Sequence, residues 1–214
     1  SGLELDYYYY YFQEVFQFDN LNYQVYVDCA NGVGSVSMFK LLDWKYFNNI
    51  RLINTHTSTP HLLNYQSGSD YVCSERKFPN SIEDYPNNDL YASLDGDADR
   101  VVFYFQEQDK FCLLDGDRII SLIVYYLSTI LPMTEFYIGV VHTAYSNGNF
   151  INYLKNFQVV TECVATGVKH LHAAAQKYDI GIYFESNGHG TILIKNDFSY
   201  LFPKIQHLKE ICNQ

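Results

Sequence analysis

Short apolar runs alternate with polar, glycine-containing turns along most of the chain. Residues 23–27 alternate between apolar and polar side chains and predict a strand. Apolar positions from Val36 to Leu42 predict the helix that follows, and the tyrosine-rich run at 7–16 predicts a packed helix. Residues 54–89 are rich in Asn, Ser, Thr, Pro and His, and predict loops with short strands.

The second half has a more regular alternation of strand and helix patterns. Strands are predicted over 111–114, 136–141, 159–163 and 179–184, and helices over 119–131, 147–157 and 168–178. Such alternation is typical of an α/β layer with a mainly parallel sheet. With 214 residues the chain is long enough for two modest domains, which we place at 1–109 and 110–214.

Composition adds expectations about the interior and the partners. Aromatic residues make up 17% of the chain and charged residues 18%, below the usual level of about a quarter. We therefore expect an aromatic-rich core. A net charge of −10 disfavours nucleic acid and anionic membranes as partners. A small anionic ligand would need local positive groups.

The cysteine pattern favours a cytoplasmic location. The five cysteines are widely spaced, odd in number and include no C-x-x-C pair, as expected of reduced thiols. The sequence opens without a positively charged, apolar leader. Its longest apolar run, 119–131, is shorter than the about 20 residues that a membrane span needs.

Three aspartates, Asp95, Asp97 and Asp99, stand at every second position between two β-prone segments. A strand–loop–strand turn would bring these alternate side chains to one point, where their carboxylates would repel one another without a cation. Oxygen ligands suit a hard cation, Mg²⁺ or Ca²⁺. With three carboxylates only, water or substrate phosphate would complete the shell, which is the usual arrangement for Mg²⁺.

Three other interpretations of this loop compete. An EF-hand would have Gly at the sixth position and Glu at the twelfth, where Arg100 and Gln106 stand. A dehalogenase-type phosphatase would carry Gly-Thr after its first two aspartates, where Ala98 and Asp99 stand. The last alternative is a polar hairpin turn without a ligand, because Asp and Gly are ordinary turn residues. Three aspartates at alternate positions would make that turn unnecessarily repulsive.

Two other polar turns precede predicted helices. The turn at 32–34 could bind phosphate at a helix start, but Ser37 replaces the third glycine of a dinucleotide fingerprint. We therefore favour a tight strand–helix connection there. Asp115 and Asp117 could form a second metal pair, although we favour capping of the helix that follows.

A strand gives way to a helix through glycine at residues 165–172. Backbone amides at the helix start, together with Lys169, suit an anionic group. His170 could exchange protons near neutral pH. The alternative is a capped helix with a surface lysine and histidine.

The loop after the next strand carries Glu185, Asn187 and His189 at alternate positions. Carboxylate, amide and imidazole groups can therefore project together. These groups donate to and accept from sugar hydroxyls, so a carbohydrate ligand is chemically natural. The alternative is a hairpin with polar turn residues.

Several of these motifs resemble one family. Asp-Gly-Asp-Ala-Asp-Arg at 95–100 resembles the metal loop of the α-D-phosphohexomutase superfamily. Four further segments resemble one family of this superfamily, the phosphoacetylglucosamine mutases: residues 27–32, 68–72, 166–172 and 184–191. The Asn-Gly-His form of the sugar loop favours this family over phosphoglucomutases and phosphomannomutases, which usually carry Ser-Gly-His. The resemblance runs from about residue 7 to 191.

The resemblance implies two successive phosphohexomutase-type α/β domains, with mixed, mainly parallel sheets flanked by helices. They would be the family's second domain and an incomplete third domain. Its implied site residues are Asp95, Asp97 and Asp99 for Mg²⁺, Arg100 facing phosphate, Glu185, Asn187, His189, Thr166 and Gly167 for substrate, and Lys169 and His170 for proton transfer or phosphate contact.

The implied reaction moves phosphate between O6 and O1 of N-acetylglucosamine through a bisphosphate intermediate, on the route to UDP-N-acetylglucosamine. The family's phosphoserine loop, Thr-Ala-Ser-His-Asn-Pro, and its fourth-domain loop, Arg-Pro-Ser-Gly-Thr-Glu, do not occur in this sequence. We therefore expect a fragment that lacks the first and fourth domains and binds without turnover. The alternatives are a non-catalytic, mutase-derived module that binds metal or sugar phosphate, and a phosphatase whose nucleophile would be a metal-loop aspartate.

Overall fold

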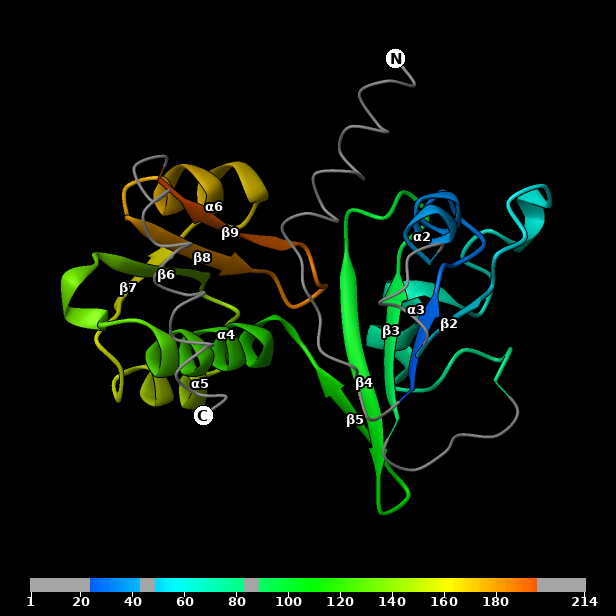
Figure 1. Cartoon of the computed structure of the whole chain (residues 1–214), viewed down its shortest axis with the longest axis horizontal. Helices are drawn as coiled ribbons and strands as arrows, with labels where there is room; N and C mark the ends of the chain where they lie inside the picture. The colour runs from blue at the N-terminus through cyan, green and yellow to red at the C-terminus, as the bar shows by residue number, and fades with distance from the viewer. Residues whose placement is uncertain (1–23, 43–48, 83–88, 196–214) are drawn as a thin grey trace, which may run out of the picture. The chain divides into compact units, whose positions relative to one another are not determined.

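The computed structural model describes residues 24–42, 49–82 and 89–195, and the tyrosine-rich run at 7–16 lies outside them. The chain forms two compact units, Ser1–Leu113 and Leu114–Gln214, each with its own sheet and helices (Figure 1). The sequence prediction placed the boundary between residues 109 and 110.

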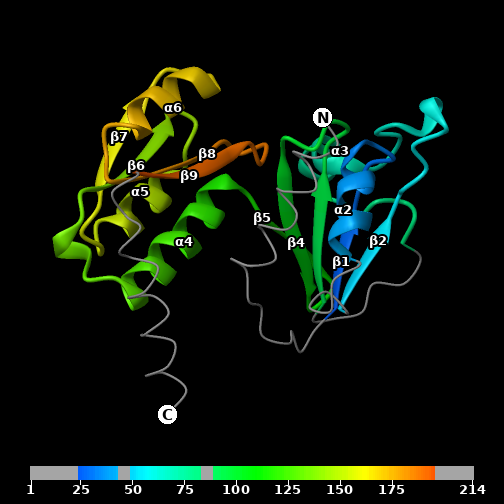
Figure 2. The same cartoon turned by 45° about the horizontal axis from the view of Figure 1, so that its top comes forward.

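The first unit contains a five-stranded sheet with the order β2-β1-β3-β4-β5 (Figure 2). Its strands are β1 (Val25–Asp28), β2 (Ile50–Ile53), β3 (Leu90–Leu94), β4 (Val101–Glu107) and β5 (Lys110–Leu114). β1 pairs in parallel with β2 and β3, and β4 runs antiparallel to β3. The strand predicted at 111–114, which the sequence assigned to the second domain, therefore extends the first sheet.

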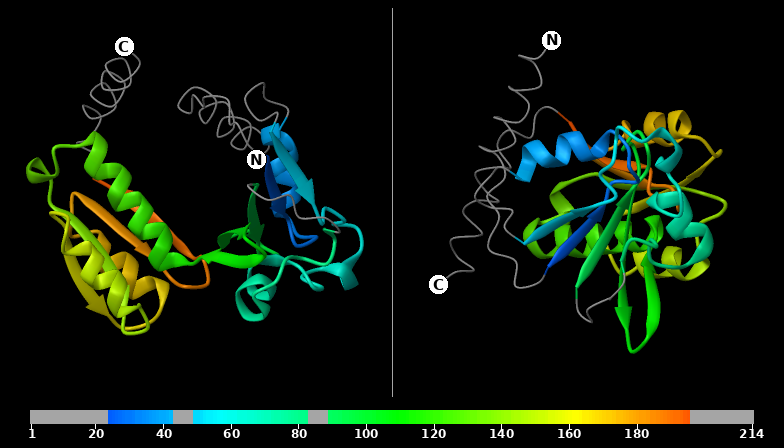
Figure 3. Two further views of the ribbon diagram at one scale, coloured as in Figure 1. Left: turned by 90° about the horizontal axis from the view of Figure 1, so that it is seen from below. Right: turned by 90° about the vertical axis from the view of Figure 1, so that its right-hand side faces the viewer.

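Helices α2 (Gly34–Leu42) and α3 (Gly68–Glu75) lie on opposite faces of this sheet (Figure 3), and a short 3₁₀ helix, η1, covers Pro60–Leu62. Side chains alternate between the faces along each strand. Val27 packs in a cluster with Met38 of α2, whereas Tyr91 packs in another with Val72 of α3. The sequence pattern predicts loops with short strands over residues 54–89. That prediction is wrong for Gly68–Glu75, which form α3. Its sequence places only a few apolar side chains in two turns, which hides the helical period.

The expected aromatic core is confirmed in the described part of the first unit. Tyr91 and Tyr104 are fully buried, and their stacked rings have centroids 5.7 Å apart. Phe78 meets both edge-on, at 4.8 and 5.3 Å. Offset-stacked and edge-to-face pairs are the favoured aromatic geometries.

The second unit contains a four-stranded sheet with the order β7-β6-β8-β9. Its strands are β6 (Ile138–Thr143), β7 (Val160–Val164), β8 (Ile180–Phe184) and β9 (Gly190–Ile194). β6 is parallel to β7 and β8, and β9 returns antiparallel to β8. The fold prediction of mixed, mainly parallel sheets flanked by helices is confirmed.

Helices α4 (Gly116–Ile130) and α5 (Gly148–Leu154) cover one face of this sheet, and α6 (Val168–Ala175) covers the other (Figure 1). Another 3₁₀ helix, η2, covers Met133–Glu135. Val140 and Ile182 point toward α4 and α5, whereas their neighbours Val141 and Tyr183 pack with α6. Two-residue alternation therefore builds a core on each side.

Two findings bear on the expected location. Among the described residues, no helix combines the length and the apolar character that crossing a membrane requires. Cys29, Cys112 and Cys163 are free thiols.

Helix α4 offers a matched test of the second core. Ile120 is fully buried, whereas Leu122 on the same helix is 56% exposed. We expect Ile120→Ala to lower the free energy of unfolding by about 2–5 kcal/mol, because it removes buried methyl groups and leaves a cavity. Leu122→Ala should change it by no more than about 0.5 kcal/mol. Urea denaturation followed by circular dichroism measures both, and equal effects would contradict this core.

Candidate metal site and ligand loop

In each unit, the loop with the predicted chemistry lies where a parallel strand is followed at once by an antiparallel one. The first loop, 95–100, joins β3 to β4, and the second, 185–189, joins β8 to β9. Both begin at the carboxyl ends of parallel strands, the edge where ligands bind in open α/β sheets. The immediate reversal of the chain confines alternate side chains to a short connection.

Asp95, Asp97 and Asp99 meet as the sequence predicted. One carboxylate oxygen from each lies within 4.8 Å of the others. Asp95 is buried at 9% exposure, and the other two carboxylates are exposed. Three hard oxygen donors that face a solvent-accessible space fit a divalent cation such as Mg²⁺, which keeps part of its water shell.

Arg100 lies against these carboxylates. Its backbone amide donates to Asp95 Oδ1 at 3.1 Å, and its Nε lies 3.7 Å from both Asp95 Oδ2 and Asp99 Oδ1. Its Nη1 donates to Asp70 Oδ1 of α3 at 3.0 Å. The guanidinium thus offsets part of the repulsion within the loop.

The glycine turn at residues 32–34, after β1, packs against the metal loop. The Val33 amide donates to the Gly96 carbonyl at 3.1 Å. A Cβ atom on Gly32 would stand only 2.2 Å from the same carbonyl oxygen, so a side chain cannot fit there. This close approach supports the interpretation of residues 32–34 as a structural connection.

A cavity of about 410 Å³ opens beside the metal loop. Its lining consists of Leu63, Asn64, Asp70, Asp95, Gly96, Asp97, Asp99 and Arg100. The sequence pattern gave no role to Asn64 or Asp70, because both lie in the stretch predicted as loops. An acidic residue in the first turn of a helix, as Asp70 is in α3, would have been a local signal.

The second candidate site lies on the carboxyl edge of the β7-β6-β8 ladder. Thr166 and Gly167 connect β7 to α6, and Gly167 has a φ of 119°. Lys169 and His170 are exposed in the first turn of α6, where the His170 amide donates to the Gly167 carbonyl at 2.9 Å. Because β6 lies between β7 and β8, this turn and the ligand loop share one edge of the sheet.

Backbone hydrogen bonds close the ligand loop at 185–189. The Glu185 amide donates to the His189 carbonyl at 2.7 Å, and the Gly188 amide donates to the Glu185 carbonyl at 3.0 Å. Asn187 Oδ1 accepts from the His189 amide at 3.1 Å. The side chains that could meet a sugar thus project from a closed turn.

Gly116 packs against the ligand loop, and Tyr183 lies in the strand that leads into it. A Cβ atom on Gly116 would lie 2.3 Å from the Glu185 carbonyl oxygen, so the first turn of α4 lies directly against the loop. The Tyr183 hydroxyl lies 3.2 Å from Nδ1 of His172. Burial, and then the charge of Glu185, raise the pKa of Tyr183 and keep its hydroxyl protonated.

The predicted capping role of Asp115 is confirmed. Its Oδ1 accepts from the Arg118 amide at 3.1 Å at the start of α4. Asp117 Oδ2 accepts from the Asn147 amide at 2.7 Å, which joins α4 to the cap of α5.

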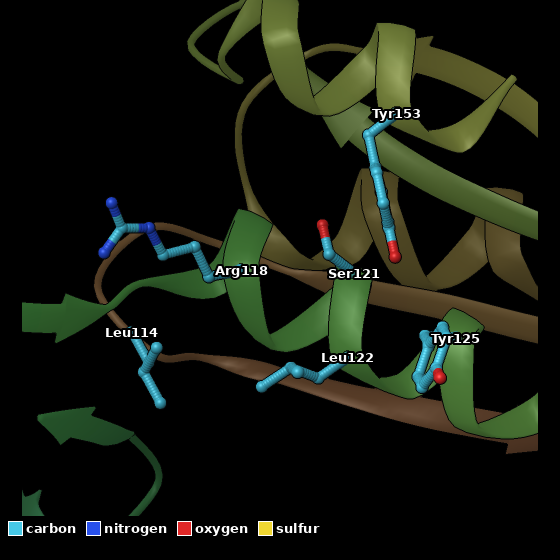
Figure 4. A pocket seen from close by; sticks show the side chains of 6 residues that line it. All are labelled: Leu114, Arg118, Ser121, Leu122, Tyr125 and Tyr153. Atoms are coloured by element: carbon cyan, nitrogen blue, oxygen red, sulfur yellow. The ribbon is translucent and has the colours of Figure 1, made fainter. Parts of the chain in front are cut away.

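A second cavity of about 410 Å³ lies on the outer side of α4 (Figure 4). Its lining consists of Leu114, Arg118, Ser121, Leu122, Tyr125 and Tyr153. None of the predicted site residues lines this cavity, so it is not part of either candidate site.

Comparison with known proteins identifies the family of this chain. The family models for phosphoacetylglucosamine mutase AMG1 match residues 2–102 as domain II and residues 115–213 as domain III. The chain belongs to the phosphoacetylglucosamine mutase family. The Saccharomyces cerevisiae phosphoacetylglucosamine mutase is 45% identical over 186 residues, which are 82% of this chain and 33% of that protein. The Homo sapiens one is 43% identical over 174 residues, 78% of this chain and 31% of the relative.

Solved structures agree. The Aspergillus fumigatus N-acetylphosphoglucosamine mutase in complex with GlcNAc-6P and magnesium has a TM-score of 0.81 and 38% identity, over 89% of this chain and 40% of that one. An N-acetylglucosamine-phosphate mutase in its apo form has a TM-score of 0.80 and 39% identity, over 91% and 44%. The chain thus spans about a third of the length of the curated phosphoacetylglucosamine mutases it matches.

Cys29 tests the burial beneath the metal loop. It is fully buried, and burial, assisted by the charge of Asp28, raises the pKa of its thiol to about 12. An ordinary cysteine has a pKa of about 8.5. Near pH 8 the thiolate fraction of such a cysteine is about a thousandfold larger than the thiolate fraction of Cys29. We expect iodoacetamide to modify the exposed Cys163 quickly and Cys29 only after unfolding. Peptide mass spectrometry measures both, and comparable native rates would contradict the buried turn.

Proposed function

We propose that this chain carries the metal-binding and sugar-binding parts of a phosphoacetylglucosamine mutase, which interconverts N-acetylglucosamine-6-phosphate and N-acetylglucosamine-1-phosphate on the route to UDP-N-acetylglucosamine. The acidic loop carries this proposal, because three carboxylates converge within 4.8 Å in a unit that matches domain II of the family. The A. fumigatus relative, solved with GlcNAc-6P and magnesium, supports both ligands. The pattern of free thiols supports a cytoplasmic location.

We assign the two units to the second and third domains of the mutase. The family models at 2–102 and 115–213 support a division into two domains, and β5 completes the first sheet beyond the boundary predicted at 109/110. The first and fourth domains, the phosphosugar and the bisphosphate intermediate are the proposed partners, and nucleic acid and membranes are not.

In this proposal Asp95, Asp97 and Asp99 hold Mg²⁺. Bound Mg²⁺ neutralises negative charge on a phosphoryl group during its transfer. Arg100 binds the phosphate. The hydrogen bond from its Nη1 to Asp70 Oδ1, at 3.0 Å, fixes one end of its guanidinium. Arg100 then presents its remaining donors to phosphate oxygens in the planar geometry that suits them.

The second unit binds the sugar. Glu185 and Asn187 bind hydroxyl groups, and His189 lies beside them in the closed turn. Thr166 and Gly167, with Lys169, bind an anionic group at the start of α6. His170 accepts or returns the proton of a reacting hydroxyl, a role that an imidazole can fill near neutral pH. The shared edge of the β7-β6-β8 ladder supports this grouping.

The central test is ³¹P NMR of the 214-residue chain with Mg²⁺, N-acetylglucosamine-6-phosphate and a catalytic amount of its 1,6-bisphosphate. We expect Mg²⁺-dependent broadening of the substrate signal and no 1-phosphate, because the sequence contains no phosphoserine motif. Asp97→Asn should abolish the broadening. Asp109→Asn, an equal change of charge in the exposed turn between β4 and β5, should not.

Two results would contradict the proposal. Growth of a 1-phosphate signal would mean that phosphoryl transfer proceeds without the phosphoserine motif. If the width of the substrate signal does not depend on Mg²⁺ in the unaltered chain, the acidic loop does not bind metal and phosphosugar together.

Lys169 provides a separate test of the second unit. Lys169→Gln should raise the dissociation constant for N-acetylglucosamine-6-phosphate about tenfold, because it removes one charge-assisted hydrogen bond. Lys155→Gln makes the same change at the exposed end of α5 and should have little effect. Substrate titrations followed by ³¹P line width distinguish them. Equal affinities would remove Lys169 from the site.

A further inference from the structure

Asp28 is a buried carboxylate to which the sequence pattern gave no chemical role. It ends β1, the strand between β2 and β3, and is fully shielded from solvent. Its register partners are Ile53 of β2 and Ser93 of β3. A charge in this position requires donors on every side, because burial removes it from water.

Four donors meet the two oxygens of Asp28. Oδ1 accepts from the Ala30 amide at 3.0 Å and from Asn54 Nδ2 at 2.7 Å. Oδ2 accepts from the Gly68 amide and from Ser93 Oγ, both at 2.7 Å. These donors come from the turns after β1 and β2, the first residue of α3, and β3.

The Ser93 bond leads directly to the metal loop. Ser93 stands two residues before Asp95, and its Oγ also lies 2.9 Å from the hydroxyl of Tyr104. Because Ser93 gives its one proton to Asp28, Tyr104 must donate to Ser93. Tyr104 belongs to β4, so the network from Asp28 reaches both strands that carry the metal loop.

The Gly68 bond reaches the other end of the same loop. Gly68 begins α3, and two residues later Asp70 accepts from Arg100, the last residue of the loop. Asp28 therefore fixes the helix that holds Arg100 as well as the strand that leads into Asp95.

We propose that Asp28 is a positioning residue of the metal site. Through Ser93 it fixes the start of the metal loop, and through α3 it fixes Asp70 and so Arg100 at the end of the loop. This inference rests on the proposed function, because it assigns to Asp28 the geometry on which metal binding depends.

Asp28→Asn makes a sharp test, because the amide has nearly the shape of the carboxylate. An asparagine offers one acceptor oxygen and an NH₂ group, which would face donors instead of accepting from them. Ser93→Ala is the milder variant. It keeps Asp28 and removes only the link toward β3 and β4, so it carries the test if Asp28→Asn does not fold.

Ser69→Ala is the matched control. Ser69 follows Gly68 in α3 and is fully buried, and its hydroxyl makes no hydrogen bond within the described part of the chain. Removing this hydroxyl changes a buried serine in the same turn without touching the Asp28 network.

Two measurements on the 214-residue chain decide the matter. Amide hydrogen exchange at Ala98 and Arg100 reports the loop itself, since both amides donate to Asp95. Titration with Mg²⁺ gives the dissociation constant of the metal. We expect Asp28→Asn and Ser93→Ala each to raise both the exchange rates and the dissociation constant at least about tenfold. Ser69→Ala should leave both within about twofold.

Loop exchange and Mg²⁺ affinity that match the Ser69→Ala values would overturn the proposal. Faster exchange spread evenly over β1, β3 and β4 would also overturn it, because it would show general destabilisation. If the unaltered chain fails to bind Mg²⁺, the proposed metal function is wrong, and the exchange rates alone still decide whether Asp28 positions the loop.

Discussion

Mutual repulsion among three carboxylates is the constraint on which the first unit is built. Two like charges 4 Å apart cost about 1 kcal/mol in water and about 4 kcal/mol at the effective dielectric of a protein surface. A loop that holds Asp95, Asp97 and Asp99 within 4.8 Å would spread apart without support. Arg100 offsets part of this charge, and the turn at 32–34 packs closely against Gly96 and donates the Val33 amide to its carbonyl.

The second unit applies the same construction to a different set of groups. Its ligand loop also joins a parallel strand to an antiparallel one, and a glycine, Gly116, lets a neighbouring element approach the loop backbone. In both units a rigid sheet edge and a short reversal determine where the side chains point. Little conformational freedom then remains to be lost when a ligand binds.

Local pattern predicted what depends on neighbouring residues and missed what depends on distant ones. Alternating strand and helix patterns in the second half indicated an α/β layer, and the spacing of Asp95, Asp97 and Asp99 indicated one cluster. The bonds of Asp28 to Gly68 and Ser93 span 40 and 65 residues, which no short window contains. The placement of β5 is a different case, because only residues 108 and 109 separate it from β4. The sequence boundary at 109/110 fell within this hairpin, and the structure places β5 in the first sheet.

The Asp28 network also shows why site geometry and backbone stability cannot be separated here. The Gly68 amide at the start of α3 and the Ala30 amide in a buried turn are donors that no helix or sheet partner satisfies. A buried carboxylate is costly alone, and so are buried amides without acceptors. Each satisfies the other, and the donors that reach Asp28 include the first residue of α3 and Ser93 of β3, which contacts Tyr104 of β4. The same bonds therefore satisfy a buried carboxylate and hold the elements that flank the acidic loop.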